Sequence, residues 1–294
     1  MMNDAPARQT PGVYHRRVGD LVITVLSDGY LEGSLSALKN IEEEAARRLL
    51  VEAFRPVPRR SDVNCFIIRN GGRTALIDCG CANTMQPSAG TMLDNLAAAG
   101  IATKDIDIVL LTHLHPDHAN ALIDADGQRR FPNAELALHE AELAYWDDDR
   151  QAAIVADTKQ GADYFAEARR QIGPYRDRLR LFRENEVFPG VTSVHMPGHT
   201  PGHSGFVVNS GKDSLLIWGD VVHVPEVQIP RPEVSHQFDS HPAIAAQTRR
   251  RVLDRAATDR QLVAGMHLHF PSFAHIVREK DSYRFLPEAW KVAL

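Results

Sequence analysis

The chain has 294 residues, a formal net charge of −5, 44% hydrophobic residues and 24% charged residues. This composition is typical of a globular protein and excludes disordered, collagenous and membrane-embedded chains. The acidic excess disfavours a nucleic-acid binder, which needs a clustered basic surface, and the three cysteines without a CxxC pair disfavour a disulfide framework or a thiolate zinc site. The 14 histidines are the unusual component.

The N-terminal sequence lacks the apolar core of a signal peptide, and no run of about 18 apolar residues occurs anywhere. We therefore expect a cytoplasmic protein with no membrane partner. The three cysteines, Cys65, Cys79 and Cys81, are expected to be small buried residues.

The first third of the chain predicts strands and one helix. Val18 to Leu26 alternates and is rich in β-branched residues, and Asp28-Gly29 after it predicts a hairpin turn. Asn40 is the expected cap of a helix over residues 41–54, which two prolines between Arg55 and Arg60 end.

The following elements alternate between strands and helices. Strands at 65–68 and 74–78 are predicted to pair around Asn70-Gly71-Gly72, and a helix over 91–99 ends at Gly100. Further along we expect strands at 106–111, 191–194, 215–218 and 261–264, and helices at 139–146, 160–172 and 242–257. Because no repeat, low-complexity tract or linker interrupts this pattern, it favours one α/β unit with mixed sheets.

The strongest chemical signal is the segment LLTHLHPDHAN, which follows a buried strand. It carries His113, His115, Asp117 and His118, and Pro116 suits the first position of a helix. Histidine and aspartate without cysteine are typical of a catalytic zinc-type centre with open positions. The alternative is a histidine-rich turn exposed to solvent. If these polar side chains are buried instead, they need a partner such as a metal ion.

Two later segments place metal-compatible side chains at strand ends. His199 lies between glycines in MPGHTPGHS, and Asp220 ends the apolar strand of LLIWGD. Three strand ends would therefore deliver ligands to one edge of the sheets.

The combination of HLHPDH, PGHTPGH, GD and a late histidine resembles the metallo-β-lactamase superfamily, from about Asn64 to the end of the chain. The resemblance implies an α/β fold, an αββα sandwich of two mixed β-sheets flanked by helices, with two divalent metals at the sheet edge. It implies one metal at His113, His115 and His199, a second metal at Asp117, His118 and His267, and Asp220 as the bridge between them.

The identity of the last ligand has alternatives, because AGMHLHFPSFAH contains His267, His269 and His275. On a strand, residues 267 and 269 would face the same side, so parity does not separate them. This tail is similar to that of the methyl parathion hydrolase family, in which the first histidine is the ligand. The resemblance therefore favours His267 over His269 and leaves His275 structural.

Asp78 in LIDCGC matches the early aspartate with which the family supports a metal-binding histidine. The alternative is a purely structural role as a turn residue at the end of a strand. His195 and His203 are expected to be ordinary hydrogen-bonded histidines, with support of a ligand as the alternative. Surface or packing roles are expected for His15, His139, His223, His236 and His241.

Two metals sharing a carboxylate would activate a bridging water as the nucleophile, and no Ser-His-Asp or Cys-His arrangement is visible to replace it. Asp117 or Asp220 would accept its proton. Tyr145, Trp146 and Phe238 are candidate walls of the substrate pocket, with a core role as the alternative.

Departures from other branches of the family narrow the substrate class. The cysteine-ligand β-lactamases would have Cys at Asp220, and another subclass would have His at Ala119. Thioester hydrolases would need a longer segment than the 27 residues after His267, and the negative charge disfavours the RNA-processing branch. The branches to which the sequence stays similar are the methyl parathion hydrolase-like enzymes and the quorum-quenching lactonases, and this resemblance implies lactones, esters or organophosphate triesters as substrates. The alternatives are β-lactam or thioester hydrolysis, or a non-hydrolytic metal-binding member.

The expected cofactors are two divalent ions, zinc first and Mn, Fe or Co otherwise. The expected partners are a small-molecule substrate and a second copy in a homodimer. The predicted organisation is an N-terminal extension at 1–60, with a strand and a helix packed on the core, and a catalytic domain at 61–294.

Overall fold

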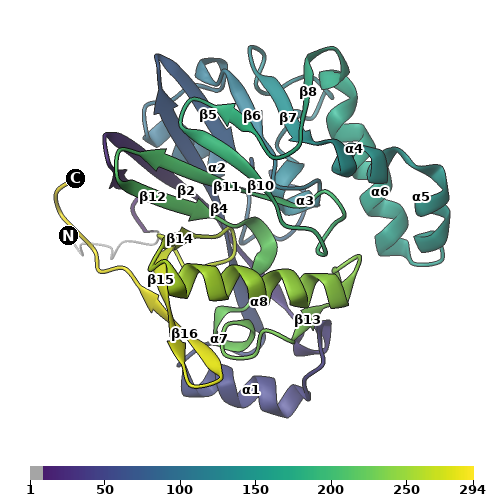
Figure 1. Ribbon diagram of the computed structural model, residues 1–294. Coiled ribbons are helices and arrows are strands. Elements are labelled where there is room, and N and C mark those ends of the chain that lie inside the picture. Colours follow the sequence, from purple (N-terminus) through teal and green to yellow (C-terminus); the bar gives the residue numbers. More distant parts are fainter. Residues whose placement is uncertain (1–8) are drawn as a thin grey trace, which may run out of the picture.

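The computed structural model describes residues 9–294, except for the side chains of residues 159 and 160. Two seven-stranded mixed sheets pack face to face, and helices cover their outer faces (Figure 1). This arrangement confirms the predicted αββα sandwich.

The first sheet has the strand order β1-β2-β4-β5-β6-β7-β8, and β5 to β8 run parallel to one another. Its strands are β1 (Val13–Val18), β2 (Leu21–Gly33), β4 (Arg59–Asn70), β5 (Arg73–Ile77), β6 (Ile108–Leu110), β7 (Glu135–His139) and β8 (Leu179–Phe182). The first two strands of the N-terminal segment, β1 and β2, therefore belong to this sheet.

The second sheet has the order β16-β15-β14-β12-β11-β10-β9, in which only β12 and β14 pair in parallel. Its strands are β9 (Glu186–Phe188), β10 (Val191–His195), β11 (Ser204–Ser210), β12 (Asp213–Ile217), β14 (Leu262–Ala264), β15 (Phe273–Glu279) and β16 (Ser282–Pro287). A short pair, β3 (Leu38–Lys39) and β13 (Ser235–His236), joins the N-terminal segment to the loop before the last helix.

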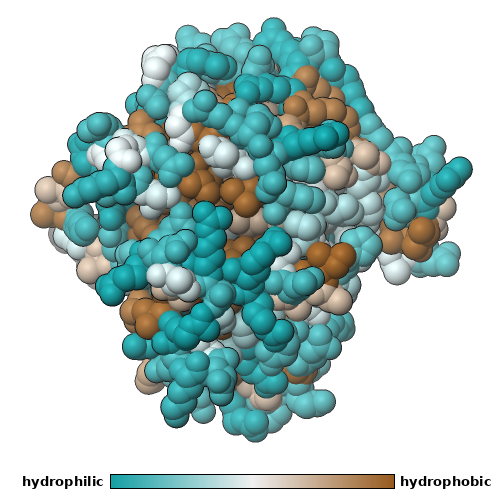
Figure 2. All heavy atoms as spheres, viewed as in Figure 1, coloured by the Kyte–Doolittle hydropathy of each residue, from teal (hydrophilic) through white to brown (hydrophobic). Residues whose placement is uncertain are grey.

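Helices flank the sheets on both outer faces. They are α1 (Glu43–Glu52), α2 (Met92–Ala98), α3 (Pro116–Ala119), α4 (Glu140–Asp147), α5 (Asp149–Val155), α6 (Lys159–Ile172), α7 (Pro225–Gln228) and α8 (Pro242–Thr258). In the described residues, none of these helices combines the length and the apolar character needed to cross a membrane. Figure 2 shows that the face around α8 is mainly hydrophilic, with separate apolar patches.

Strand β4 shows how the core follows from the two-residue period of a strand. Phe66 and Ile68 point between the two sheets, whereas Cys65 and Ile67 point to the helices that cover the first sheet. All four side chains are buried. Cys79 and Cys81 are also buried and free, as expected.

The predicted turn at Asp28-Gly29 is wrong. The hairpin turns at Gly19-Asp20, and β2 continues through Asp28-Gly29 with a bulge, because the pairing with β4 shifts register there. Gly29 has a φ of 102°, and a Cβ would lie 2.0 Å from the Ser88 carbonyl oxygen. The glycine therefore serves a bulge and a close approach of two backbones.

The cap predicted for the first helix is also wrong. Asn40 has a φ of 63°, and Glu42 is the residue at the N-cap of α1. The loops that follow β5, β6, β10, β12 and β14 all meet at one edge of the sandwich, where the candidate site lies.

Candidate metal centre

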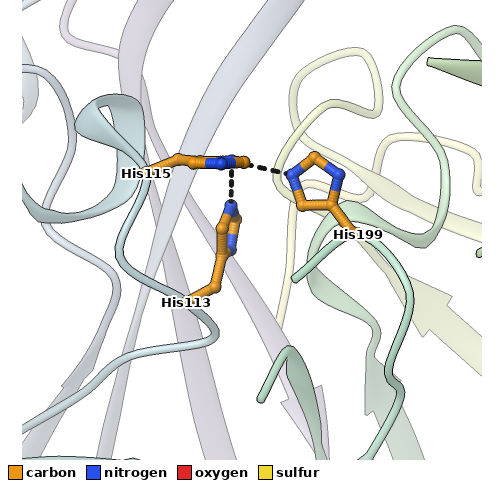
Figure 3. Close-up of side chains that lie close together, drawn as sticks. All are labelled: His113, His115 and His199. Carbon is orange, nitrogen blue, oxygen red and sulfur yellow. Dashed lines mark hydrogen bonds between the residues drawn. The ribbon is translucent and has the colours of Figure 1, made fainter. Parts of the chain in front are cut away.

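Three histidines form the first triad, which consists of His113, His115 and His199. His115 Nδ1 lies 3.0 Å from His113 Nε2 and 2.9 Å from His199 Nε2 (Figure 3). A single ring nitrogen carries either one proton or one lone pair, so it cannot make both contacts as hydrogen bonds. The three nitrogens are instead arranged as metal-ligand atoms that converge on one point. Burial lowers the pKa of His113 and His115, which keeps both rings neutral and their lone pairs available.

The second triad consists of Asp117, His118 and His267. Asp117 and His118 lie on α3, which begins at Pro116 as predicted. Asp117 Oδ2 lies 3.5 Å from His118 Nε2 and 3.4 Å from His267 Nε2. His118 Nε2 is buried and has no hydrogen-bond partner in the part of the chain that the structure describes.

Asp220 lies between the two triads. Its Oδ2 is 3.3 Å from His199 Nε2 and 3.1 Å from His267 Nε2, and its Oδ1 is 3.3 Å from His118 Nε2. Oδ1 is buried and, within residues 9–294 as described, has no hydrogen-bond partner. The carboxylate therefore faces ligand atoms of both triads.

These residues fit two divalent metal ions. Each triad brings its ligand atoms within 4.8 Å of one another, and two of the converging atoms are buried polar atoms without partners. Such atoms are costly unless something satisfies them. Nitrogen and carboxylate donors without thiolates suit zinc, manganese, iron or cobalt.

Hydrogen bonds to the remote ring nitrogens orient the ligands. Asp78 accepts from His118 Nδ1 at 2.7 Å and also from the Thr112 hydroxyl, which lies 3.0 Å from His113 Nδ1. His267 Nδ1 donates to the Asp62 carbonyl oxygen at 2.7 Å. Each bond leaves the opposite nitrogen free to bind a metal. The structure thus places Asp78 beside His118, one of the histidines of the second triad.

Asp239 is a support that the sequence did not predict. Its Oδ1 accepts from His199 Nδ1 at 2.8 Å, and its Oδ2 accepts from the backbone N–H of His236 at 2.8 Å. No motif in the sequence marks this aspartate, which lies 40 residues after its partner.

A fully buried carboxylate, Glu142 on α4, connects the two loops of the first triad. Its Oε1 accepts from the Leu114 N–H at 2.9 Å and from Trp146 Nε1 at 2.7 Å. Its Oε2 accepts from the Thr200 hydroxyl at 2.5 Å and from the Gly202 N–H at 3.1 Å. Burial raises the pKa of Glu142, and the four donors oppose that rise.

The second glycine of PGHTPGH is required by the same contact. A Cβ on Gly202 would lie 2.1 Å from the Glu142 backbone nitrogen, and one on Gly198 would lie 2.2 Å from the Ala245 nitrogen. The His199 loop is therefore held between the beginnings of α4 and α8.

His203 and His223 also reach the centre. His203 donates to the Met196 carbonyl oxygen and accepts from the Asp220 N–H, so it holds the backbone of that residue. His223 Nε2 lies 3.1 Å from Asp220 Oδ2, and neither ring nitrogen of His223 has a hydrogen bond of good geometry to any described residue. The surface or packing role predicted for His223 is therefore wrong. The turn after β12 directs its side chain into the site.

The last histidines of the chain are separated by the structure. His267 contacts Asp117 and Asp220, whereas His269 pairs with Glu226 at 2.6 Å. Both lie in a turn after β14 rather than on a strand. The strand assumed for this segment is therefore wrong, and the turn separates the two side chains.

A cavity of about 280 Å³ opens above the metal centre. It is lined by members of both triads, by Arg59 and Phe238, and by residues 31–34, 36 and 37 of the N-terminal segment. A neighbouring cavity of about 450 Å³ shares His115, Tyr164 and Phe238 with it and has a largely apolar lining.

The three predicted pocket walls lie beside these cavities. Tyr145 and Phe238 line the apolar one, and Phe238 lines both. Trp146 also contributes to the apolar cavity, but only 2% of it is exposed and it packs against His115 with ring centroids 5.6 Å apart. Trp146 is therefore mainly a core residue that supports a ligand.

Residues 58–267 match the family model described as the metallo-beta-lactamase superfamily. The crystal structure of the hydrolase AbOPH, of the beta lactamase superfamily, is 31% identical and superposes with a TM-score of 0.91, covering 97% of this chain and all of that one. The dizinc quorum-quenching lactonase AidC, in complex with a product, is 22% identical with a TM-score of 0.90, covering 96% and 99% of the two chains.

An N-acyl homoserine lactonase from Bacillus sp. is 29% identical over 122 residues, which are 42% of this chain and 40% of that relative. A second such lactonase, from Agrobacterium fabrum, is 28% identical over 129 residues, which are 42% and 44% of the two chains. The matches thus span about two fifths of the length of these relatives, which are hydrolases by name. Because the family model covers most of the chain and includes both triads, the protein belongs to the metallo-β-lactamase superfamily.

Proposed function

We propose that the protein is a dinuclear metal-dependent hydrolase that opens lactones, with N-acyl homoserine lactones as the first substrate class. The observation that carries this proposal is the pair of triads that share Asp220 at the floor of a cavity. The names of the lactonase relatives support the choice of substrate.

The ligand sets would be those implied by the resemblance, with His113, His115 and His199 at one ion, Asp117, His118 and His267 at the other, and Asp220 at both. When bound, the two ions act as Lewis acids and lower the pKa of water at the site. Zinc is the first choice for both positions.

The protein side chains would supply orientation and proton transfer. The carboxylates of Asp117 and Asp220 line the cavity. Either one would accept a proton from the water molecule that attacks the carbonyl carbon of the lactone. Asp78 and Asp239 would keep the ligand rings in place during the reaction.

The apolar cavity supports an acyl-chain substrate. It borders the metal centre through His115 and presents Tyr145, Phe165 and Ile154 to a ligand. The burial of an acyl chain there would contribute about 0.8 kcal/mol per methylene group. An aryl leaving group of an ester or phosphotriester would fit the same lining, so these remain the second substrate class.

The test is hydrolysis by the zinc-loaded protein of one panel, containing N-hexanoyl homoserine lactone, an aryl ester, an aryl phosphotriester, a thioester and a β-lactam. We expect the lactone to give the highest kcat/KM and expect a chelator to abolish it. A preference for the β-lactam or the thioester would replace the proposed substrate class. Fewer than one metal per chain, or bound iron with oxygen uptake, would contradict the dinuclear hydrolase itself.

We also propose a homodimer, in which the segment 1–60 acts as an extension of the catalytic domain at 61–294. Light scattering on the purified protein tests the dimer, since a mass near 33 kDa would contradict it.

A further inference from the structure

Arg59 is a buried cation beside the metal centre. It is the first residue of β4, only 7% of it is exposed, and it lines the cavity together with Asp117 and Asp220. Among the described residues, Arg59 forms no ion pair within 4.0 Å, whereas its neighbour Arg60 pairs with Glu32 at 2.9 Å.

Two neutral groups hold the guanidinium group of Arg59. Its Nη1 donates to the Ser61 hydroxyl at 2.7 Å, and its Nη2 donates to His236 Nε2 at 2.8 Å. Its Nε is buried and has no hydrogen-bond partner among the described residues. The side chain is therefore fixed in position while its charge has no adjacent counter-charge.

The backbone makes room for this side chain. A Cβ on Gly33, at the end of β2, would lie 2.7 Å from Arg59 Nη2 and 2.8 Å from Cζ. Gly33 lies outside the left-handed region, so its glycine is explained by the space that the guanidinium group occupies. The guanidinium group of Arg59 thus occupies the space that a side chain at position 33 would need, which favours a functional role for this arginine.

A buried charge is unfavourable unless an opposite charge compensates it. Burial lowers the pKa of Arg59 to about 10, and the Asp117 carboxylate opposes this change, so the group stays charged at neutral pH. The Asp117 and Asp220 carboxylates face the two triads, where divalent ions would compete for them. Because Arg59 lines the cavity, an anion bound there would supply the missing counter-charge.

We propose that Arg59 is a specificity-determining residue that binds an oxyanion of the ligand in this cavity. The chemical class is a carboxylate, such as the acid formed when a lactone or ester is hydrolysed, or a phosphate-type anion from a phosphotriester. Guanidinium binds both through charge-assisted hydrogen bonds. The choice of substrate rests on the proposed function, but the binding of the anion does not.

Arg60 offers a matched control, because it is the next residue on the same strand, carries the same charge and has its partner on the surface. The experiment compares zinc-loaded wild type, Arg59→Gln, Arg59→Lys and Arg60→Gln by isothermal titration calorimetry. The probes are N-hexanoyl-L-homoserine, its neutral carboxamide and diethyl phosphate. Metal content and melting temperature are measured for every variant.

For Arg59→Gln we expect the Kd of both anions to rise about tenfold or more, the loss of one hydrogen bond to a charged group. The Kd of the carboxamide should change less than about twofold, Arg59→Lys should fall between, and Arg60→Gln should match wild type. A rise for one anion alone identifies its source as the carboxylate or the phosphate. Unchanged anion binding in Arg59→Gln would overturn the proposal.

A second variant decides the case in which Arg59→Gln does not fold. Ser61→Ala removes one of the two groups that hold the guanidinium group and keeps its charge. We expect it to raise the Kd of both anions and not that of the carboxamide, whereas equal changes for all three probes would contradict the proposal. Because no turnover is needed, a wrong substrate class would appear separately, as anion binding without lactone hydrolysis.

Discussion

The two triads differ in where their support comes from. The second triad is held by residues of β4 and of the segment after β5, namely the Asp62 carbonyl group and Asp78. The first triad is linked to Asp78 only through the Thr112 hydroxyl, and its direct support comes from carboxylates far from its motifs, Glu142 on α4 and Asp239 before α8. Equivalent chemistry at two neighbouring positions thus depends on different parts of the fold.

The loops to be joined explain this difference. In the first triad, His113 and His115 follow a strand of the first sheet, and His199 follows a strand of the second sheet. Glu142 accepts from the backbone of both loops, so one side chain fixes their separation. In the second triad, two ligands already share one turn of helix, which leaves only His267 to be positioned.

The largest effect is expected for Asp220→Ala, because it removes the group that both triads share. We expect a loss of hydrolysis of about 1000-fold or more, which corresponds to about 4 kcal/mol of barrier. The measurements are kcat/KM and metal content. Asp213→Ala, at the exposed start of β12, the strand that precedes Asp220, is the control. Wild-type hydrolysis by Asp220→Ala would contradict a shared centre.

The next largest effect is expected for the two aspartates that hold ligand rings, Asp239 in the first triad and Asp78 in the second. Asp239→Asn should lower metal affinity at the first triad, and Asp78→Asn should lower it mainly at the second, each by about 10- to 100-fold. Each change is made in a His267→Ala background, in which only the first triad is complete, and metal content is followed against a competing chelator. The comparison fails if Asp78→Asn weakens this remaining site as much as Asp239→Asn does.

A smaller effect is expected for Glu142→Gln. The amide cannot accept all four hydrogen bonds, so at least one buried donor loses its partner at a cost of about 1–3 kcal/mol. We expect a lower melting temperature and roughly tenfold weaker metal binding in the His267→Ala background.

The control for Glu142→Gln is Tyr175→Phe. This change removes a buried hydroxyl group that accepts from the Phe131 N–H and donates to the Leu122 carbonyl oxygen. It should lower the melting temperature without changing metal affinity. If both variants lose stability and neither loses metal, Glu142 supports the fold and not the first triad.

The comparison also shows how far the sequence could predict the site. Ligands and Asp78 carry local signals, since each follows an apolar strand and sits in a short motif. Glu142 reads as an ordinary helix residue, and its burial results only from the packing of α4 against the His199 loop. Supports that arise from tertiary packing leave no periodic pattern in the chain.

The fold itself was predictable where apolar runs are long. Strands β4, β5 and β12 and helix α8 lie where their patterns place them, whereas the turn that the sequence predicts at Asp28-Gly29 is a bulge in β2. A glycine with positive φ serves a turn and a bulge equally well, so the local sequence cannot distinguish them. Only the pairing of β2 with β4 decides between the two.

The smallest effect tests whether the anchor of the first triad depends on pH. His139 is the N-cap of α4, and its Nδ1 accepts from the Ala141 N–H at 3.1 Å. Burial, together with the His195 ring stacked 4.3 Å away, lowers the pKa of His139 to about 4, below the value near 6.5 of the unfolded chain.

The unfolded chain therefore binds the proton first, so this histidine costs stability as the pH falls from about 7 to 4. We expect the free energy of unfolding to drop by about 2 kcal/mol from this source. His139→Asn keeps a good N-cap and does not titrate, so its urea unfolding should show a smaller loss between pH 7 and 4.5 than wild type. Equal losses in both proteins would mean that α4, and with it Glu142, is held independently of its cap.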